Sequence, residues 1–462
     1  MPLLNSIARD ELFSECFYNK NNNNGALEIP QDVTEVPWDG YWKNLNWKCV
    51  DMRRACQLKI IGEQAFDGCK SLFQVFFAPN VQVVQAQAFH NCLMLHSVVG
   101  FDKLVNLTEI GVEAFAGCGS LTNMLLPPTI ITLGGGAFFR CVRLQKVRLP
   151  PNNLNTIPSH AFYGCSELQE INLESTMVCT IEEMAFTMCV RLIEVGVPPT
   201  LETIGPYSFS SCKSLQTIHG LNQACRLQTI GREAFRDCAA LILLDLTHTI
   251  VQVIQEGTFD GCRRLQEIVL NAELMDIASN AFRGCSALQT VHFHPSSHLK
   301  TIGAGAFEDC KTLNHVTFPS SLESIECEAF RGCSNLDSVA FQDGLRCIAE
   351  YAFFGCESLI DVTIPSSVDY LMENSFDGDS LERIDTNGDR LELSIRLWSM
   401  YPDAFVGLSE EKWCYLYCHD DKNFCSIMTR KDNEKLDCVK QIFANNLHKL
   451  AHWSISVGSI GT

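Results

Sequence analysis

The chain has 462 residues, of which 35 are Lys or Arg and 54 are Asp or Glu, so its formal net charge is −19. This acidic balance argues against nucleic acid and against an anionic membrane surface as partners, because binding to either depends on Lys and Arg that face phosphate groups. Hydrophobic residues make up 46% of the chain, enough to fill a packed core, and no apolar run reaches the ~20 residues of a membrane-spanning helix.

The first 50 residues form an N-terminal segment without a repeated pattern. Its first twenty residues lack a basic stretch followed by an apolar stretch, so no secretory signal is predicted. An Asn-rich linker follows at residues 19–25, and residues 27–47 are rich in Trp and Tyr with partial alternation. We expect this last stretch to form a capping strand over the first repeat, because the ends of repeat proteins need covers.

Over residues 51–385 one pattern recurs at intervals of about 24 residues. The octet AFDGCKSL at residues 65–72 returns, for example, as AFAGCGSL at 114–121, AFYGCSEL at 161–168 and AFFGCESL at 352–359. Such a period indicates stacked repeats, each of which buries its apolar side chains against its neighbours. Fourteen units are recognised by their phenylalanine, at positions 66, 89, 115, 138, 162, 186, 209, 235, 259, 282, 307, 330, 353 and 376.

Each unit reads I-G-x-x-A-F-x-x-C-x-x-L-x-x-V-x-L/F-P. Ala and Cys are four residues apart, which places them on one face of a short helical turn. Gly precedes the Cys position in eight of the fourteen units, as at Gly68 and Gly355, and it suits a left-handed residue that closes such a turn. The L-x-x-V-x-L stretch reads as a short strand, and the Pro that often follows ends it because Pro cannot donate to a sheet.

These features predict an α/β solenoid of about fourteen coils, each of ~23–26 residues, with a parallel sheet on one wall and short helical turns on the other. The repeat resembles the BspA-like, treponemal-type leucine-rich repeat family over roughly residues 55–385. The resemblance implies a leucine-rich repeat solenoid that serves in interaction or adhesion, since proteins of this family are mostly such modules and many are exposed at cell surfaces. It does not imply a particular biochemical role.

The chain has 24 cysteines, and thirteen of them occupy the same place in the repeat. Stacking would bring these thirteen into a column, each about 5 Å from the next. We interpret the column as packing material, because buried free Cys behaves as a small hydrophobic residue. Disulfides and zinc sites are the alternatives, but parallel thiols do not converge on one metal ion. The last unit has Asp379 at this position, which predicts that the column reaches solvent there.

The outward positions of the predicted strands form the candidate binding surface, since side chains alternate along a strand. At the position after the central Val, the first coils carry Phe76, Val99 and Leu125, followed by Arg148. Three exposed apolar residues in a row can mark an interaction site, and cover by the N-terminal segment is the alternative. We therefore predict a protein partner at these four residues, and no cofactor, metal ligand or catalytic residue.

Two coils are longer than the others and carry insertions at residues 100–111 and 220–231. Insertions in solenoids map to loops that often lie on the binding face, and neutral drift is the alternative explanation. Three histidines, His292, His294 and His315, fall on neighbouring strands with the same outward parity. Metal binding would need further ligands within reach, so solvated histidines are the simpler interpretation.

Residues 386–462 lie beyond the repeats, and we expect them to form a partly helical C-terminal cap. Residues 385–396 resemble the opening of a calcium-binding loop but lack its Gly at position 6 and its Glu at position 12, which favours a polar turn. The Cys and His residues of 413–425 do not follow a common zinc spacing. Apolar residues in 432–452 recur like one face of a helix that packs on the last coil, and a separate partner-binding module is the alternative.

The sequence contains no motif of a phosphate-binding loop, a serine hydrolase, a metalloprotease or a kinase, so we do not expect an enzyme. The first functional hypothesis is a protein–protein interaction scaffold in the cytoplasm, because many cysteines without a secretory signal fit a reducing compartment. The alternative is a cell-surface adhesin or recognition ectodomain, which the family resemblance supports. Neither the partner nor the oligomeric state follows from the sequence.

Overall fold

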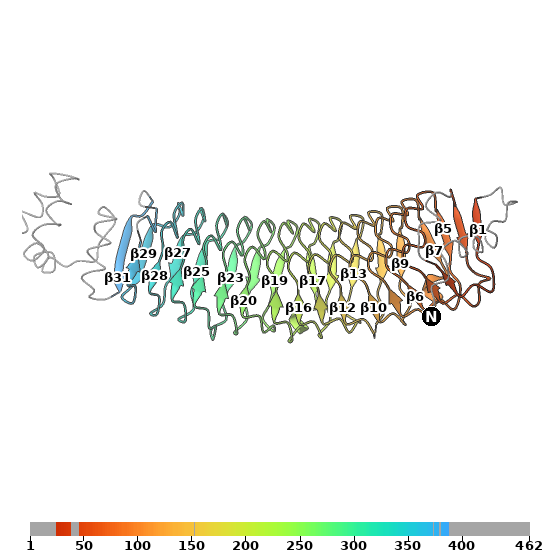
Figure 1. The fold of residues 1–462 in the computed structure, drawn as a ribbon. Helices are drawn as coiled ribbons and strands as arrows, with labels where there is room; N and C mark the ends of the chain where they lie inside the picture. Colours follow the sequence, from red (N-terminus) through yellow and green to blue (C-terminus); the bar gives the residue numbers. More distant parts are fainter. Residues whose placement is uncertain (1–24, 38–45, 152, 373, 378–379, 388–462) are drawn as a thin grey trace, which may run out of the picture.

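The computed structural model describes residues 25–37, 46–151, 153–372, 374–377 and 380–387. These residues form an elongated, gently curved parallel β-solenoid of about fifteen turns (Figure 1). Each turn contributes two short strands, and most strands pair with the equivalent strands of neighbouring turns, so two parallel ladders with a few interruptions run along the molecule. Nowhere in the described ranges is there a helix long and apolar enough to cross a membrane.

The first ladder consists mainly of three-residue strands whose middle side chain points inward and whose flanking side chains point outward. It is divided into five sheets, of four, five, three, two and two strands. The strands are β1 (Ala26–Glu28), β3 (Cys49–Asp51), β5 (Gln74–Phe76), β7 (Ser97–Val99), β9 (Asn123–Leu125), β11 (Lys146–Arg148), β13 (Glu170–Asn172), β15 (Glu194–Gly196), β17 (Thr217–His219), β19 (Leu243–Asp245), β21 (Glu267–Val269), β23 (Thr290–His292), β25 (His315–Thr317), β27 (Ser338–Ala340), β29 (Asp361–Pro365) and β31 (Arg383–Asn387).

The second ladder consists of two-residue strands, and the sequence pattern did not predict it. The second residue of each strand is buried and the first faces outward. The ladder forms one sheet of five strands and one of ten. The strands are β2 (Glu35–Val36), β4 (Ile60–Ile61), β6 (Val83–Val84), β8 (Glu109–Ile110), β10 (Thr132–Leu133), β12 (Thr156–Ile157), β14 (Thr180–Ile181), β16 (Thr203–Ile204), β18 (Thr229–Ile230), β20 (Val253–Ile254), β22 (Asp276–Ile277), β24 (Thr301–Ile302), β26 (Ser324–Ile325), β28 (Cys347–Ile348) and β30 (Tyr370–Leu371).

The A-F-x-x-C stretch is not helical, so the prediction of short helical turns is wrong. In a helix the N–H of Phe66 would bond four residues back, but it donates instead to the carbonyl of Ala88 on the next coil, at 2.7 Å. The N–H of Cys69 bonds only three residues back, to Phe66. Positive φ angles at Gln64 (53°) and Gly68 (71°) separate consecutive β-turns. This wall, which we call the turn wall, is therefore a run of β-turns joined by bonds between coils.

The residue before the ladder cysteine is left-handed, as predicted. Its φ is positive in all thirteen units that have the cysteine, including the seven in which it is Gly. A left-handed conformation costs about 1–2 kcal/mol for a residue with a side chain. In the six units without Gly, the hydrogen bonds between coils must therefore offset this cost. Those six residues are Asn91, Arg140, Met188, Ser211, Asp237 and Asp309.

The core is organised around the repeated phenylalanine. All fourteen ladder phenylalanines are buried, and consecutive rings stack with centroids 5.1–5.7 Å apart, from Phe66 to Phe376. Stacked aromatic pairs contribute ~0.5–1.5 kcal/mol each beyond the area they bury. The interior is therefore continuous along the rod, and each coil depends on its neighbours.

The cysteine column is a column of buried thiols, as predicted. Nineteen cysteines lie in the described part of the chain, none of them in a disulfide, and the thirteen of the repeat are all buried. From Cys92 onward each ladder thiol donates to the carbonyl of a ladder phenylalanine; Cys92 bonds Phe66 at 3.1 Å. Burial raises the pKa of Cys141 and of Cys212 to about 12. These thiols stay protonated and fill the core.

The ladders begin before the first recognisable octet, because Ala26 pairs in parallel register with Cys49. The division into an N-terminal segment of residues 1–50, a solenoid of 51–385 and a C-terminal cap of 386–462 stays a prediction. Several other predictions concern positions outside the described residues: Asp379, the part of the calcium-loop-like stretch beyond 387, the Cys and His residues of 413–425, and the helix expected in 432–452.

Candidate functional site

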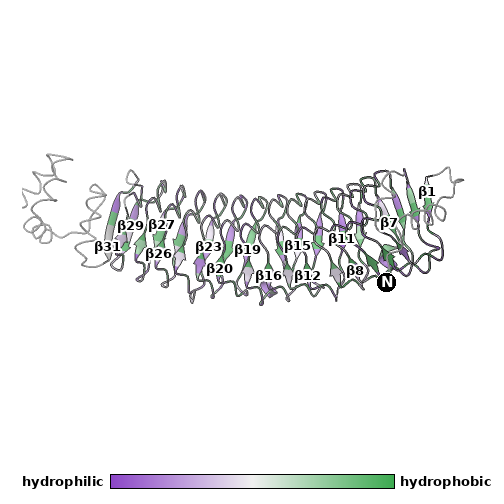
Figure 2. Cartoon of the chain, viewed as in Figure 1, coloured by the Kyte–Doolittle hydropathy of each residue, from purple (hydrophilic) through white to green (hydrophobic). Residues whose placement is uncertain are grey.

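The outward side chains of the first ladder form a continuous surface, which we call the strand wall. It has two columns, made by the first and the third residue of the strands, and neighbours in a column are ~4.8 Å apart. Figure 2 shows polar and apolar segments alternating among these strands. The wall therefore offers a long series of regularly spaced side chains of mixed character.

Phe76 and Val99, two of the predicted site residues, are register partners in β5 and β7. Val99 is 40% exposed, but the guanidinium of Arg53 lies 4.3 Å from the ring centroid of Phe76. Asp51 holds Arg53 in this position through an ion pair of 2.6 Å, and the pKa of the Asp51 carboxyl is lowered chiefly by this bond. Phe76 is therefore partly covered from within the chain, while Val99 is open.

Leu125 and Arg148, the other two predicted residues, are register partners in β9 and β11. Leu125 is 42% exposed and Arg148 is also exposed. The first ladder is interrupted between β7 and β9, so Val99 and Leu125 lie on consecutive coils without being paired in one sheet. The structure thus brings the four residues together as two adjacent pairs. Their role in binding a partner stays a prediction.

The interruption coincides with the first of the two insertions, and the second insertion coincides with the break between β17 and β19. Each insertion starts at a left-handed glycine, Gly100 or Gly220, and continues as a 3-10 helix, η1 (Phe101–Lys103) or η2 (Leu221–Gln223). The first side chain of each helix, Phe101 or Leu221, is buried. The ring of Phe101 packs edge-on against that of Phe115, with centroids 5.8 Å apart. These segments therefore add to the core.

The three histidines singled out in the sequence are not brought together. The Nε2 atom of His292 lies 3.1 Å from a carboxylate oxygen of Glu267, and the Nδ1 atom of His315 lies 2.8 Å from the hydroxyl of Ser338. His294 accepts a hydrogen bond from a backbone N–H two residues later. Among the residues that the structure describes, no group of three or more His, Cys, Asp and Glu side chains is arranged to hold a metal ion.

Three further cations on the coil of Arg148 were not recognised from the sequence. Arg140, Arg143 and Lys146 are all exposed. The signal that could have identified them is the local charge: residues 114–166 contain four Lys or Arg and no Asp or Glu, in a chain with 54 acidic residues. Together with Arg148, they make residues 140–148 a positively charged segment of an acidic protein.

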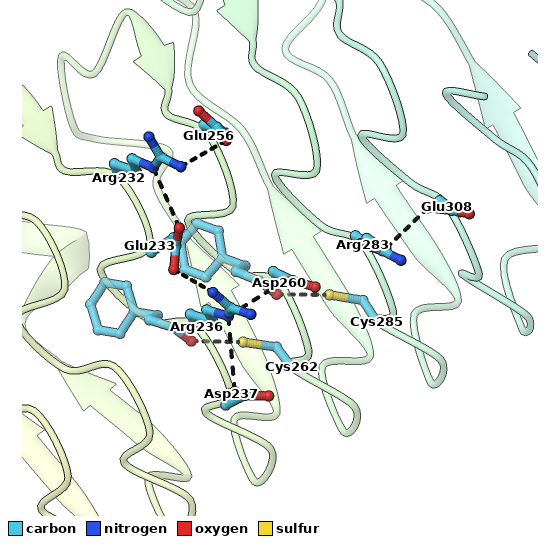
Figure 3. A network of polar contacts seen from close by, with 12 residues as sticks. Arg232, Glu233, Arg236, Asp237, Glu256, Asp260, Cys262, Arg283, Cys285 and Glu308 are labelled. Atoms are coloured by element: carbon cyan, nitrogen blue, oxygen red, sulfur yellow. Dashed lines mark hydrogen bonds and ion pairs between the residues drawn. The ribbon is translucent and has the colours of Figure 1, made fainter. Parts of the chain in front are cut away.

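Between residues 232 and 308 of the turn wall, by contrast, three arginines pair with acids from the same and neighbouring coils (Figure 3). Arg236 lies 2.6 Å from Glu233 and 3.6 Å from Asp260. Glu233 raises the pKa of Arg236, and burial raises the pKa of Asp260. These paired side chains therefore offer little unpaired charge to a partner. The network also includes Arg232 with Glu256 and Arg283 with Glu308, each pair at 3.0 Å.

Several solved structures are similar to this chain. A leucine-rich repeat protein from Bacteroides ovatus is 24% identical, with a TM-score of 0.64 over 80% of this chain and 98% of its own. A leucine rich cell surface protein from Faecalibacterium prausnitzii is 22% identical (TM-score 0.37, 80% and 90% covered). The pneumococcal vaccine antigen PcpA is 14% identical (TM-score 0.40, 84% and 95% covered). The first likeness shows a shared fold.

A comparison with curated proteins finds no match. The family model described as "BspA type Leucine rich repeat region (6 copies)" matches residues 9–107, 101–216, 179–312 and 300–395. These overlapping matches span most of the chain, and they agree with the stacked turns, the phenylalanine ladder and the two parallel ladders described above. The chain therefore belongs to the BspA-type leucine-rich repeat family.

Proposed function

We propose that this protein is a non-enzymatic recognition scaffold that binds protein partners on the strand wall. The observation that carries the proposal is the outward placement of Val99 and Leu125, each about two-fifths exposed, beside the unpaired cation Arg148. Apolar residues that remain exposed on a rigid surface are typical of interaction sites. Solenoids present such extended surfaces because their regular coils hold side chains at fixed spacing.

The interior of the solenoid supports the same proposal. Its space is filled by the stacked phenylalanines and by thiols whose hydrogen bonds are directed to backbone carbonyls. Burial raises the pKa of thiols such as Cys285 and Cys356, and a protonated thiol is a poor nucleophile. The repeated residues therefore stabilise the solenoid. The outward strand residues, which differ from coil to coil, are the ones available to bind a partner.

Affinity capture from a lysate of the source cells tests the proposal. Three baits would be compared: wild type, Val99→Ser/Leu125→Ser on the strand wall, and Ile131→Ser/Tyr370→Ser as a control. Both control side chains are exposed; Tyr370 lies in β30 of the second ladder and Ile131 directly precedes β10. A partner that binds wild type and the control but not the strand-wall variant supports the proposal. A partner lost only with the control variant would move the site to the second ladder.

A recognition module at the cell surface is the second candidate, and membership of the BspA-type family supports it. The cytoplasmic scaffold and the surface module differ in the expected state of the thiols. Titration of the unfolded, unreduced protein with Ellman's reagent should find nearly 24 thiols if the protein resides in a reducing compartment. A clearly smaller number, with the remainder recovered after reduction, would favour the surface module.

A further inference from the structure

One coil carries four exposed cations, Arg140, Arg143, Lys146 and Arg148, and we call this cluster the basic coil. No ion pair is described for any of the four. Arg140 instead places its guanidinium 5.4 Å from the ring centroid of Phe139. Lys146 and Arg148 are near neighbours on one strand, and their like charges favour a bound group of opposite charge.

Nearby acids do not neutralise the basic coil. Glu167 lies on the next coil, where its backbone N–H bonds to the carbonyl next to Arg143, but its carboxylate pairs with Arg191. Glu170 is the register partner of Lys146, yet no ion pair between their side chains is described. The positive charge of the coil therefore remains available to an external group.

An uncharged strand with one exposed aliphatic side chain, Leu125, borders the basic coil on its other side. Leu125 is the register partner of Arg148, and Asn123 is that of Lys146. Both partners belong to residues 114–139, a stretch of 26 residues without any charged side chain. A ligand that reaches from the basic coil onto this stretch meets cations first and then an apolar side chain.

We propose that the basic coil and Leu125 bind an extended acidic segment of a partner protein. Lys146 and Arg148 are two residues apart on one strand, so their side chains point the same way about 6.6 Å apart. Alternate residues of an extended peptide have the same spacing, which lets two of its carboxylates face these two cations. An aliphatic side chain of the segment packs on Leu125. This inference rests on the proposed function and specifies the chemistry of the partner.

The arrangement favours a short acidic segment over a long polyanion. In the column that contains Lys146, the next two coils carry Glu170 and Glu194. Nucleic acid or a sulfated glycan running along the rod would meet these carboxylates, and the whole chain has a net charge of −19. A segment that crosses the wall along the basic coil meets Lys146 and Arg148, and residues 140–148 contain no Asp or Glu.

Fluorescence anisotropy with the full-length chain tests the inference. The probe is a fluorescein-labelled twelve-residue peptide with glutamates at alternate positions and two leucines, and the control probe has lysine in place of every glutamate. We expect the acidic peptide to bind at least ~10-fold more tightly than the basic one, and added salt to weaken its binding because exposed charges are screened.

Paired variants locate the site. Lys146→Glu/Arg148→Glu should weaken binding of the acidic peptide at least ~10-fold, and Leu125→Ser should weaken it several-fold. Arg263→Glu/Arg264→Glu makes the same change of charge at two exposed positions on another coil, and Leu243→Ser removes an equally exposed leucine from the strand wall. Both controls should bind within about twofold of wild type. Unchanged circular dichroism shows that each variant is folded.

Three outcomes would overturn the inference: no binding of the acidic peptide up to millimolar concentration, equal loss in the two charge-reversed variants, or tighter binding of a twelve-nucleotide DNA strand or a heparin oligosaccharide. The proposed function fails separately. If a captured partner depends on Val99 and Leu125 while the acidic peptide does not bind, the strand wall remains the binding surface and only the acidic segment is wrong.

Discussion

The thiol of Cys262 donates a hydrogen bond to the carbonyl oxygen of Phe235 on the preceding coil, with 3.3 Å between sulfur and oxygen (Figure 3). The same oxygen accepts the backbone N–H of Cys238 at 3.1 Å. Both acceptor sites of this buried carbonyl are therefore occupied by cysteines, one from its own coil and one from the next. The recurrence of cysteine follows from this arrangement, because serine would add polarity and alanine would leave the carbonyl with one bond.

Replacing a ladder thiol should destabilise the solenoid. Cys262→Ala removes the hydrogen bond to Phe235 and leaves a small void, so we expect a loss of ~1–3 kcal/mol in the free energy of unfolding, measured by urea denaturation. Cys225→Ala, at an exposed thiol, is the control and should stay within ~0.5 kcal/mol of wild type. Equal effects of the two changes would show that the ladder bond contributes nothing measurable.

Stability should fall at alkaline pH because of the buried thiols. Burial raises the pKa of Cys141 from 9.0 to about 12. The folded chain holds this proton more tightly than the unfolded chain, so the stabilisation is complete below pH 9 and is lost as the pH rises toward 12. Each such thiol lowers the free energy of unfolding by ~1.4 kcal/mol per pH unit in this window. Urea denaturation from pH 7 to 11 measures the slope, and a flat profile above pH 9 would be the contrary result.

Removing one ring should loosen the neighbouring coils. Phe235 stacks between Phe209 at 5.2 Å and Phe259 at 5.4 Å. Phe235→Ala should cost about 3–5 kcal/mol, and the loss should be local because each coil contacts only its neighbours. Hydrogen exchange should show reduced protection near Phe209 and Phe259 but not near Phe66. Phe354→Ala, at a partly exposed ring, should leave protection nearly unchanged.

The left-handed positions allow opposite predictions at two equivalent sites. Met188 has φ of 61°, whereas Gly284 has φ of 67° and no neighbour closer than 3.9 Å to an added Cβ atom. Met188→Gly should therefore be neutral or stabilise by up to ~1 kcal/mol, and Gly284→Ala should destabilise by ~1–2 kcal/mol. Thermal unfolding measures both. If Met188→Gly destabilised the protein as much as Gly284→Ala, the packing of the Met188 side chain would outweigh the strain of its backbone.

Much of the fold could be predicted because the same sequence pattern recurs in fourteen units. The spacing of Phe66 and Cys69 and of their counterparts predicted stacked coils, a buried column of thiols and one wall of strands. The helical turns were predicted wrongly because residues four apart share a face in a helix, while the N–H of Phe66 bonds Ala88 on the next coil. A bond between coils depends on stacking, and one repeat read alone does not reveal it.

The candidate site was predictable only in part. Alternation along the strands placed Val99, Leu125 and Arg148 outward, as observed. The cover of Phe76 by Arg53 was not predicted, since a cation from the preceding coil reaches the ring only once the coils are stacked. The absence of an ion pair between Glu167 and the basic coil could not be predicted either, because it depends on the folded position of Arg191, with which Glu167 pairs.

The central claim is that partners bind the strand wall, and site-specific photo-crosslinking tests it most directly. A photoreactive phenylalanine analogue would be placed singly at strand-wall positions Leu125, Asn172 and Thr290, and at second-ladder positions Thr180 and Thr301. The protein would then be irradiated with its captured partner. We predict cross-links from one or more strand-wall positions and none from Thr180 or Thr301. Cross-links confined to the second-ladder positions would contradict the account.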